Sequence, residues 1–337
     1  MTITAPCDPV VLSNGRLEDE CLCHLVCHMT IANDDSFQAA ARRLNAIEVV
    51  DPLPARFAGK TITASLDTLL AVNAVNACYW AVADATPWSW RGERGFLGML
   101  DLALELPDGP EPVAMRLAAA LRQYGHGLQL LPERIRALEE LAAALPTKDA
   151  ALELKRDCGD DAAAFVRELV AHCPSFSDII PLPKSKSQFV YELDSPSPQR
   201  DGGLVTVETI EPVLMHKRAW LTTMLCNRLA SAGHTDLAFR DPERVAMAID
   251  YRLPVACRHL GLLRLNDDLA SRIDRREILP ANGKEEISLR IATAVCFRRL
   301  LNFFMADVTP ERLDLMLWTH SRKATEIEAH RSVTMAY

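Results

Sequence analysis

The chain has 337 residues, of which 49% are hydrophobic and 24% charged, as is usual for a globular protein with a sizeable core. Its formal net charge of -8 argues against sequence-independent binding to nucleic acid, which needs a basic surface. Because the sequence has no uncharged run of membrane-spanning length and no secretory signal, we expect a cytoplasmic protein whose ten cysteines are reduced.

A group of cysteines and histidines stands near the N-terminus. The pairs Cys23/Cys27 and His24/His28 are each four residues apart, so each pair would share one face of a helix. A structural zinc site usually needs a second, separated pair of ligands, and we find none in the sequence. We therefore expect a packed helix here and no metal site.

Helical spacing of apolar residues dominates the rest of the chain. The predicted helices cover residues 37–44, 66–80, 112–145 with a break at 124–127, 150–173 with a break at Gly159, 216–232, 241–250, 253 onward, 285–305 and 312–325. Residues 181–212 are rich in Pro, Ser and Gly and predict a loop or small hairpin, well suited to a surface insertion or lid. The expected fold is therefore predominantly all-α, as a single domain over residues 1–337.

Several common catalytic motifs are missing from the sequence. It contains no P-loop, no dinucleotide-binding glycine fingerprint after a strand, no H-E-x-x-H and no G-x-S-x-G. This excludes the usual nucleotide-cofactor, zinc-protease and serine-hydrolase classes.

Two segments in the first third carry polar or aromatic groups of uncertain purpose. Asn73 and Asn76 lie on an apolar helix, where a buried amide must either bond the backbone or contact a ligand. Residues 88–96 form a turn with aromatic and cationic side chains, which could stack on a flat ring or cover the core. The residues alone leave both alternatives open.

The stretch from 245 to 261 places a carboxylate, a phenol and a guanidinium side by side. Asp250, Tyr251 and Arg252 lie between an apolar run and a helix that begins at Leu253-Pro254. Asp250 is therefore a candidate catalytic acid with a neighbouring cation. The alternative is that Asp250 caps the helix and Tyr251 packs in the core, since Asp before a proline-led helix is a common start signal.

The last predicted helix carries a second group of this kind. Asp314, Trp318 and Arg322 are each four residues apart and so share one helix face. Such a face is either an exposed, salt-bridged surface or the wall of a ligand site.

The order of these motifs resembles that of the queuosine salvage proteins, which are queuosine 5′-phosphate N-glycosylase/hydrolases. The stretches Asp250–Pro254 and His259–Gly261 are similar to that family's Ala-Asp-Tyr-Arg-x-Pro and His-Leu-Gly elements. Further stretches resemble family motifs in the same order, at residues 76–80, 173–178, 216–219, 286–290 and 313–318. The chain is thus identified as a divergent member.

This resemblance implies an all-α, two-lobed fold related to helix-hairpin-helix DNA glycosylases. It implies hydrolysis of the bond between a 7-deazaguanine-type base and ribose 5-phosphate, which releases queuine without a metal or other cofactor. The partner would be a small-molecule nucleotide or nucleobase, with no direct contact to nucleic acid or membrane. The oligomeric state stays open.

The resemblance also suggests roles for individual residues. Cleavage of an N-glycosidic bond develops positive charge on the sugar, and a nearby carboxylate stabilises that charge. Asp250 is expected as the sugar-side carboxylate or base, and Asp314 as a second carboxylate that recognises the base or its substituent. The expected substrate-binding residues are Asn76 and Trp80 at the base, Lys217, Arg218 and Arg322 at the 5′-phosphate, and Tyr251, Arg252 and Trp318 nearby.

The sequence departs from the family pattern where the pocket walls are expected. Leu225, Cys226 and Asn227 stand where the family carries an acid and a later Trp, and Thr319 stands where Asp is frequent. One alternative is therefore an enzyme recruited to another small molecule in specialised metabolism. Another is a non-catalytic nucleobase-binding protein, although a pure binder does not need the retained Asp250 unless its ligand pairs with that acid.

Overall fold

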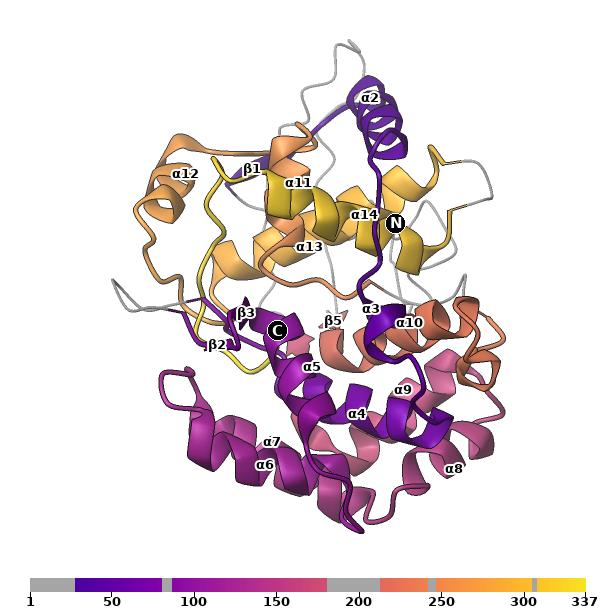
Figure 1. The fold of residues 1–337 in the computed structure, drawn as a ribbon. Coiled ribbons are helices and arrows are strands. Elements are labelled where there is room, and N and C mark those ends of the chain that lie inside the picture. Colours follow the sequence, from indigo (N-terminus) through magenta and orange to yellow (C-terminus); the bar gives the residue numbers. More distant parts are fainter. Residues whose placement is uncertain (1–27, 81–86, 181–212, 242–246, 305–307) are drawn as a thin grey trace, which may run out of the picture.

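The computed structural model describes residues 28–80, 87–180, 213–241, 247–304 and 308–337. These residues form a predominantly helical protein with two lobes, one above the other in Figure 1. The predicted all-α class is confirmed. Residues 21–27 of the cysteine and histidine group, and the predicted loop at 181–212, lie outside the described residues. Within the described part, no helix is long and apolar enough to cross a membrane.

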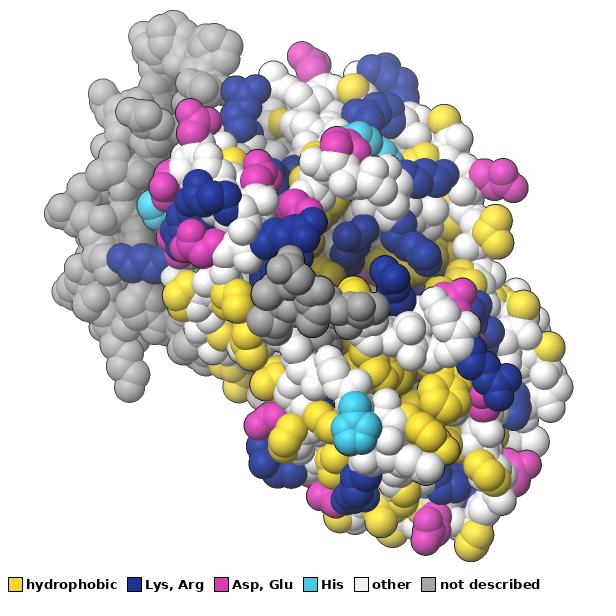
Figure 2. Space-filling view, turned by 60° about the vertical axis from the view of Figure 1, so that its left-hand side comes forward, with side chains coloured by type: hydrophobic (Ala, Val, Ile, Leu, Met, Phe, Trp, Pro, Cys, Tyr) yellow, Lys and Arg dark blue, Asp and Glu magenta, His cyan; other side chains and the backbone are white. Residues whose placement is uncertain are grey.

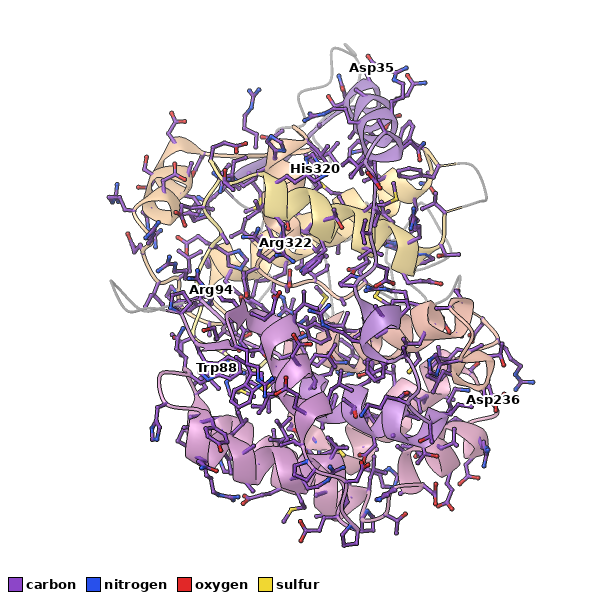
Figure 3. The ribbon with its side chains drawn as sticks, in the orientation of Figure 1. Asp35, Trp88, Arg94, Asp236, His320 and Arg322 are labelled. Atoms are coloured by element: carbon purple, nitrogen blue, oxygen red, sulfur yellow. The ribbon has the colours of Figure 1, made fainter. Side chains whose placement is uncertain are left out.

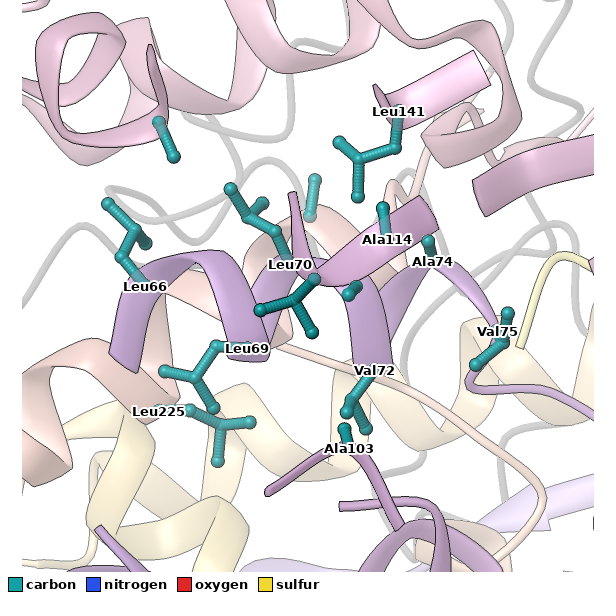
Figure 4. Packing of buried hydrophobic residues seen from close by; sticks show 14 of the residues in the cluster. Leu66, Leu69, Leu70, Val72, Ala74, Val75, Ala103, Ala114, Leu141 and Leu225 are labelled. Carbon is teal, nitrogen blue, oxygen red and sulfur yellow. The ribbon is translucent and has the colours of Figure 1, made fainter. Parts of the chain in front are cut away.

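The lower lobe is built around helix α4, which spans Ile62–Ala74. The hydroxyl oxygen of Thr61 accepts a hydrogen bond from the backbone N–H of Ala64 at 3.2 Å and so caps this helix. Side chains on all its faces are buried, and Figure 4 shows leucines of α4 packed among side chains of the surrounding helices. The other helices of this lobe are α3 (Leu53–Arg56), α5 (Gly95–Glu105), α6 (Val113–Tyr124), α7 (Leu131–Ala144), α8 (Ala150–Asp157), α9 (Ala162–His172) and α10 (Lys217–Ser231), with short 3₁₀ turns at Pro174–Phe176 and Thr235–Leu237.

The upper lobe has a second hydrophobic core. Phe37 and Leu44 of one helix pack there with Leu289, Phe297 and other side chains of the C-terminal helices. The helices of this lobe are α2 (Asp34–Asn45), α11 (Leu253–His259), α12 (Asp267–Asp274), α13 (Lys284–Leu301) and α14 (Pro310–Lys323).

The described residues include three short antiparallel strand pairs. Two of them join segments that are distant in sequence, and the third closes a tight turn. The pairs are β1 (Met29–Ile31) with β6 (Leu263–Leu265), β2 (Ser89–Trp90) with β3 (Glu93–Arg94), and β4 (Ile179–Ile180) with β5 (Val213–Leu214). The β2–β3 hairpin leads directly into α5 at the boundary between the lobes. Across this boundary, α10 and α14 contact each other.

Two predicted helices differ from the structure where the chain borders the cavity. The helix expected over 66–80 ends at Ala74, because the backbone oxygens beyond it bind buried side chains instead of continuing the helical ladder. Residues 247–250, which were predicted to end a helix begun at 241, are not helical. Both irregular segments border the cavity described below.

Candidate active site

A cavity of about 490 Å³ lies between the two lobes. Its walls come from residues 76–80 after α4, the β2–β3 hairpin and the start of α5, together with α10, α11 and α14. Nine of the ten predicted site residues line it, namely Asn76, Trp80, Lys217, Asp250, Tyr251, Arg252, Asp314, Trp318 and Arg322. These nine residues come from four separate stretches of the chain and meet in one place.

Asp250 binds the backbone at the start of α11 and also borders the cavity. Its Oδ1 atom accepts hydrogen bonds from the backbone N–H groups of Arg252 at 2.7 Å and Leu253 at 3.1 Å. These bonds satisfy donors at the start of α11, as a helix cap does. The same carboxylate lines the cavity and is only partly buried. One oxygen is thus held by the backbone, while the carboxylate as a whole borders the ligand space.

Asp314 is the more deeply buried carboxylate of the cavity, with 8% of its surface exposed. Burial, together with the negative charge of Asp250, raises the pKa of Asp314 to about 7. No described residue donates a hydrogen bond to it. At neutral pH this group therefore exchanges between an acid that can donate a proton and a carboxylate.

Lys217, the first residue of α10, brings a positive charge to the same space. Its side chain is buried, and its Nζ atom donates to the backbone oxygen of Asn76 at 3.4 Å. Burial lowers the pKa of Lys217 to about 8, and the charges of Asp250 and Asp314 limit that decrease. The ammonium is therefore charged at neutral pH and offsets part of the negative charge of the two carboxylates.

Arg218 is the predicted site residue that does not line the cavity. Its guanidinium donates hydrogen bonds to the backbone oxygens of Ala74 and Ser175 and lies 5.6 Å from the ring centre of Phe176. The side chain is almost completely buried. Because neighbouring helical residues point in different directions, Lys217 and Arg218 serve different surroundings.

Two tryptophans form aromatic parts of the wall, and each has an arginine on its ring. The guanidinium carbon of Arg331 lies 5.5 Å from the ring centre of Trp80, and that of Arg322 lies 4.9 Å from Trp318. Such contacts are attractive cation–π interactions. Both indoles line the cavity and are only partly buried, so they offer apolar surface to a flat ligand.

Cations also gather at the cavity rim. Arg94, at the end of the hairpin, and Arg252 and Arg322 line the cavity, and none of the three has an ion pair with an acid in the described part of the chain. Figure 3 places Arg94 and Arg322 at the boundary of the two lobes. Figure 2 shows Lys and Arg side chains around the hollow between the two lobes. The rim is therefore suited to an anionic group.

Several wall residues were missed by the sequence-based assignment. Tyr79, Arg228 and Tyr337 line the cavity, and so does Arg94. Arg94 lies in the turn that the sequence singled out for its aromatic and cationic residues, so that pattern was the available signal. Tyr337 lies far from the other motifs, and only the folded chain brings its backbone oxygen to within 3.4 Å of the backbone nitrogen of Cys78.

The arrangement suits acid–base chemistry on a small polar molecule. A carboxylate held by backbone donors, a second carboxyl with a pKa near 7 and a buried ammonium border one space with aromatic walls. Among the described residues, no group of His, Cys, Asp and Glu side chains is arranged to hold a metal ion.

Comparison with known proteins gives a consistent result. Residues 205–337 match the family model described as "Queuosine salvage protein". The chain is 27% identical over 292 residues to the queuosine 5′-phosphate N-glycosylase/hydrolase of Sphaerobacter thermophilus, a match that covers 80% of each chain. It is 28% identical over 119 residues to the protein of that name from Mus musculus, which covers 31% of this chain and 35% of the mouse protein. The region of the family match includes Lys217, Asp250 and Asp314, so all three lie in the part of the chain that is similar to the queuosine salvage proteins.

Proposed function

We propose that this protein hydrolyses the N-glycosidic bond of queuosine 5′-phosphate or a closely related deazapurine nucleotide and releases the free base. The observation that carries the proposal is the pair of carboxyl groups, Asp250 and Asp314, on one cavity with Lys217 beside them. The names of the two relatives agree with this activity.

In the proposed reaction, the bond between C1′ of ribose and the base nitrogen breaks, and its electron pair leaves with the base. Asp250 stabilises the positive charge that develops on the sugar and accepts a proton from the attacking water. The water oxygen forms the new bond to C1′. Asp314, in its acid form, supplies a proton to the departing base, so the two products are ribose 5-phosphate and the neutral base.

The remaining groups of the cavity are assigned to recognition. We place the base against Trp80 or Trp318, because an indole face stacks well on a flat heterocycle. We place the 5′-phosphate at Arg322, Arg252 and Arg94, whose guanidinium groups have no carboxylate partner among the described residues. Lys217 is assigned to the reaction centre instead of the phosphate, because it is buried near both carboxylates.

The direct test is incubation of the purified protein with queuosine 5′-monophosphate, with chromatography and mass spectrometry to detect queuine. Release of queuine at a rate proportional to enzyme concentration is the expected result. The matched control substrate is guanosine 5′-monophosphate, which has the same phosphate and sugar but lacks the deazapurine substituent. If neither nucleotide is cleaved, the proposed activity is wrong and the cavity serves another small molecule.

A further inference from the structure

The cavity wall formed by residues 75–80 is an irregular segment that buried side chains hold in place. Its side chains Asn76, Tyr79 and Trp80 line the cavity. The segment directly follows α4 but leaves the helical path, and Cys78 adopts a positive φ of 39°. Such a backbone conformation costs energy in a non-glycine residue, so surrounding contacts must maintain it.

Arg134 of α7 supplies several of these contacts. Its side chain is completely buried. Its Nη1 atom donates to the backbone oxygen of Val75, and its Nη2 atom donates to the backbone oxygen of Ala77. Its Nε atom donates to the backbone oxygen of Gln129 at 2.8 Å. One guanidinium therefore joins the start of α7 to two carbonyl groups of the wall, on either side of Asn76.

The same guanidinium also supports an aromatic residue of the wall. Its central carbon lies 4.9 Å from the ring centre of Tyr79. Arg218 binds the preceding backbone oxygen, that of Ala74, and Lys217 binds the oxygen of Asn76, which lies between the two that Arg134 binds. Three buried cations thus hold the four successive carbonyl groups of residues 74–77, and Arg134 holds two of them. The hydroxyl of Tyr79 also donates to the backbone oxygen of Val75, at 3.2 Å.

We propose that Arg134 is a positioning residue for substrate recognition, which fixes Asn76, Tyr79 and Trp80 in the cavity although Arg134 itself does not line it. The planar guanidinium reaches three acceptors at fixed angles, whereas a lysine ammonium carries its donors on a single nitrogen. The substrate named in the tests rests on the proposed function, whereas the role of Arg134 rests on the contacts above.

The test compares Arg134→Lys with a matched control in the same lobe, Lys155→Met. Lys155 is also a buried cation that binds a backbone oxygen, that of Ala238 at 2.8 Å, but it does not line the cavity or touch its wall. We expect Arg134→Lys to raise KM for queuosine 5′-monophosphate about tenfold and to change kcat by less than about threefold, since it weakens binding before the reaction. Lys155→Met should lower the melting temperature without changing KM.

A second variant distinguishes the loss of positioning from a general loss of folding. In Arg134→Ala, millimolar guanidinium should restore part of the affinity by occupying the vacated space, while the same salt should not improve Lys155→Met. A folded Arg134→Lys protein with unchanged KM, or an Arg134→Ala protein that guanidinium does not improve, would overturn the proposal.

A readout independent of activity separates this inference from the proposed function. Hydrogen exchange, followed by mass spectrometry, should show faster exchange in residues 75–80 of Arg134→Lys but not of Lys155→Met. If wild-type protein cleaves no queuosine 5′-monophosphate yet this local change is present, the activity is wrong and the positioning role stands. If exchange of residues 75–80 is the same in Arg134→Lys and wild type, the positioning role is wrong.

Discussion

Arg252 donates a hydrogen bond from Nη2 to the backbone oxygen of Ser321 at 2.6 Å. Its backbone N–H also donates to Oδ1 of Asp250. One residue therefore holds the carboxylate at the start of α11 and ties that turn to α14, which carries Asp314. The relative position of the two carboxyl groups is built into the framework of the upper lobe.

Replacement of Asp250 by Asn tests its assignment to the sugar. The amide keeps a similar shape and an oxygen that can accept the backbone hydrogen bonds, but it loses the negative charge. We expect kcat for queuosine 5′-monophosphate to fall about 100- to 10,000-fold, with little change in melting temperature. Steady-state kinetics measure this, with Asp236→Asn on the exposed surface as the control. Unchanged turnover in Asp250→Asn would remove Asp250 from the mechanism.

The pH dependence of the reaction tests Asp314. Because its pKa is raised to about 7, the acid form is abundant below pH 7 and is lost above it. Above pH 7 we expect kcat/KM to fall, at a rate that approaches about tenfold per pH unit. Asp314→Asn, which cannot donate this proton, should lose that part of the profile. A second decrease near pH 8 is expected from deprotonation of Lys217, and Lys217→Met should lack it. Identical profiles for wild type and Asp314→Asn would contradict the role of Asp314.

The same pKa shift predicts a change in stability. Because the pKa of Asp314 is higher in the folded than in the unfolded chain, the folded state binds more protons between about pH 4 and pH 7. The contribution of Asp314 to the free energy of unfolding is therefore largest at low pH and falls as pH rises to 7. Between about pH 4 and about pH 8, the free energy of unfolding of Asp314→Asn should rise by about 2–4 kcal/mol relative to that of the wild type. Urea unfolding at both pH values measures this, and a difference that does not depend on pH would refute it.

The phosphate assignment can be tested at the cavity rim. Arg322→Gln should weaken binding of queuosine 5′-monophosphate about tenfold but leave binding of the unphosphorylated nucleoside nearly unchanged, because only the nucleotide uses the guanidinium charge. Isothermal titration with the Asp250→Asn protein would measure both affinities without turnover. Lys323→Gln is a suitable control, since Lys323 is the exposed next residue and does not line the cavity. If Arg322→Gln weakens binding of the nucleotide and the nucleoside equally, the assignment of the phosphate to Arg322 is wrong.

Local sequence patterns were sufficient for most of the fold and for the central motif. The helices around α6 and α7, with their break near Gly125, followed from apolar spacing, and Asp250 followed from its place before a proline-led helix. One oxygen of Asp250 binds the backbone at the start of α11, as the cap alternative predicted. The carboxylate also borders the cavity, and its catalytic role stays a prediction.

Long-range contacts account for what the sequence could not predict. Apolar spacing continued α4 through residue 80, but hydrogen bonds from Arg134 and Arg218 end the helix at Ala74. The Lys217-Arg218 pair suggested two phosphate ligands, yet adjacent positions on a buried helix face different surroundings, and Arg218 points to backbone oxygens. Tyr337 reaches the cavity only through contacts with a distant segment.

The thiol of Cys78 lies 3.1 Å from the backbone oxygen of Ser332, a partner 254 residues away in the chain. Contacts of such separation carry a large loop-closure cost and form late in folding. Residues 330–337 must therefore be synthesised and docked before the wall at residues 75–80 is complete. Ligand affinity should therefore require the docking of residues 330–337 and not only the formation of the two hydrophobic cores.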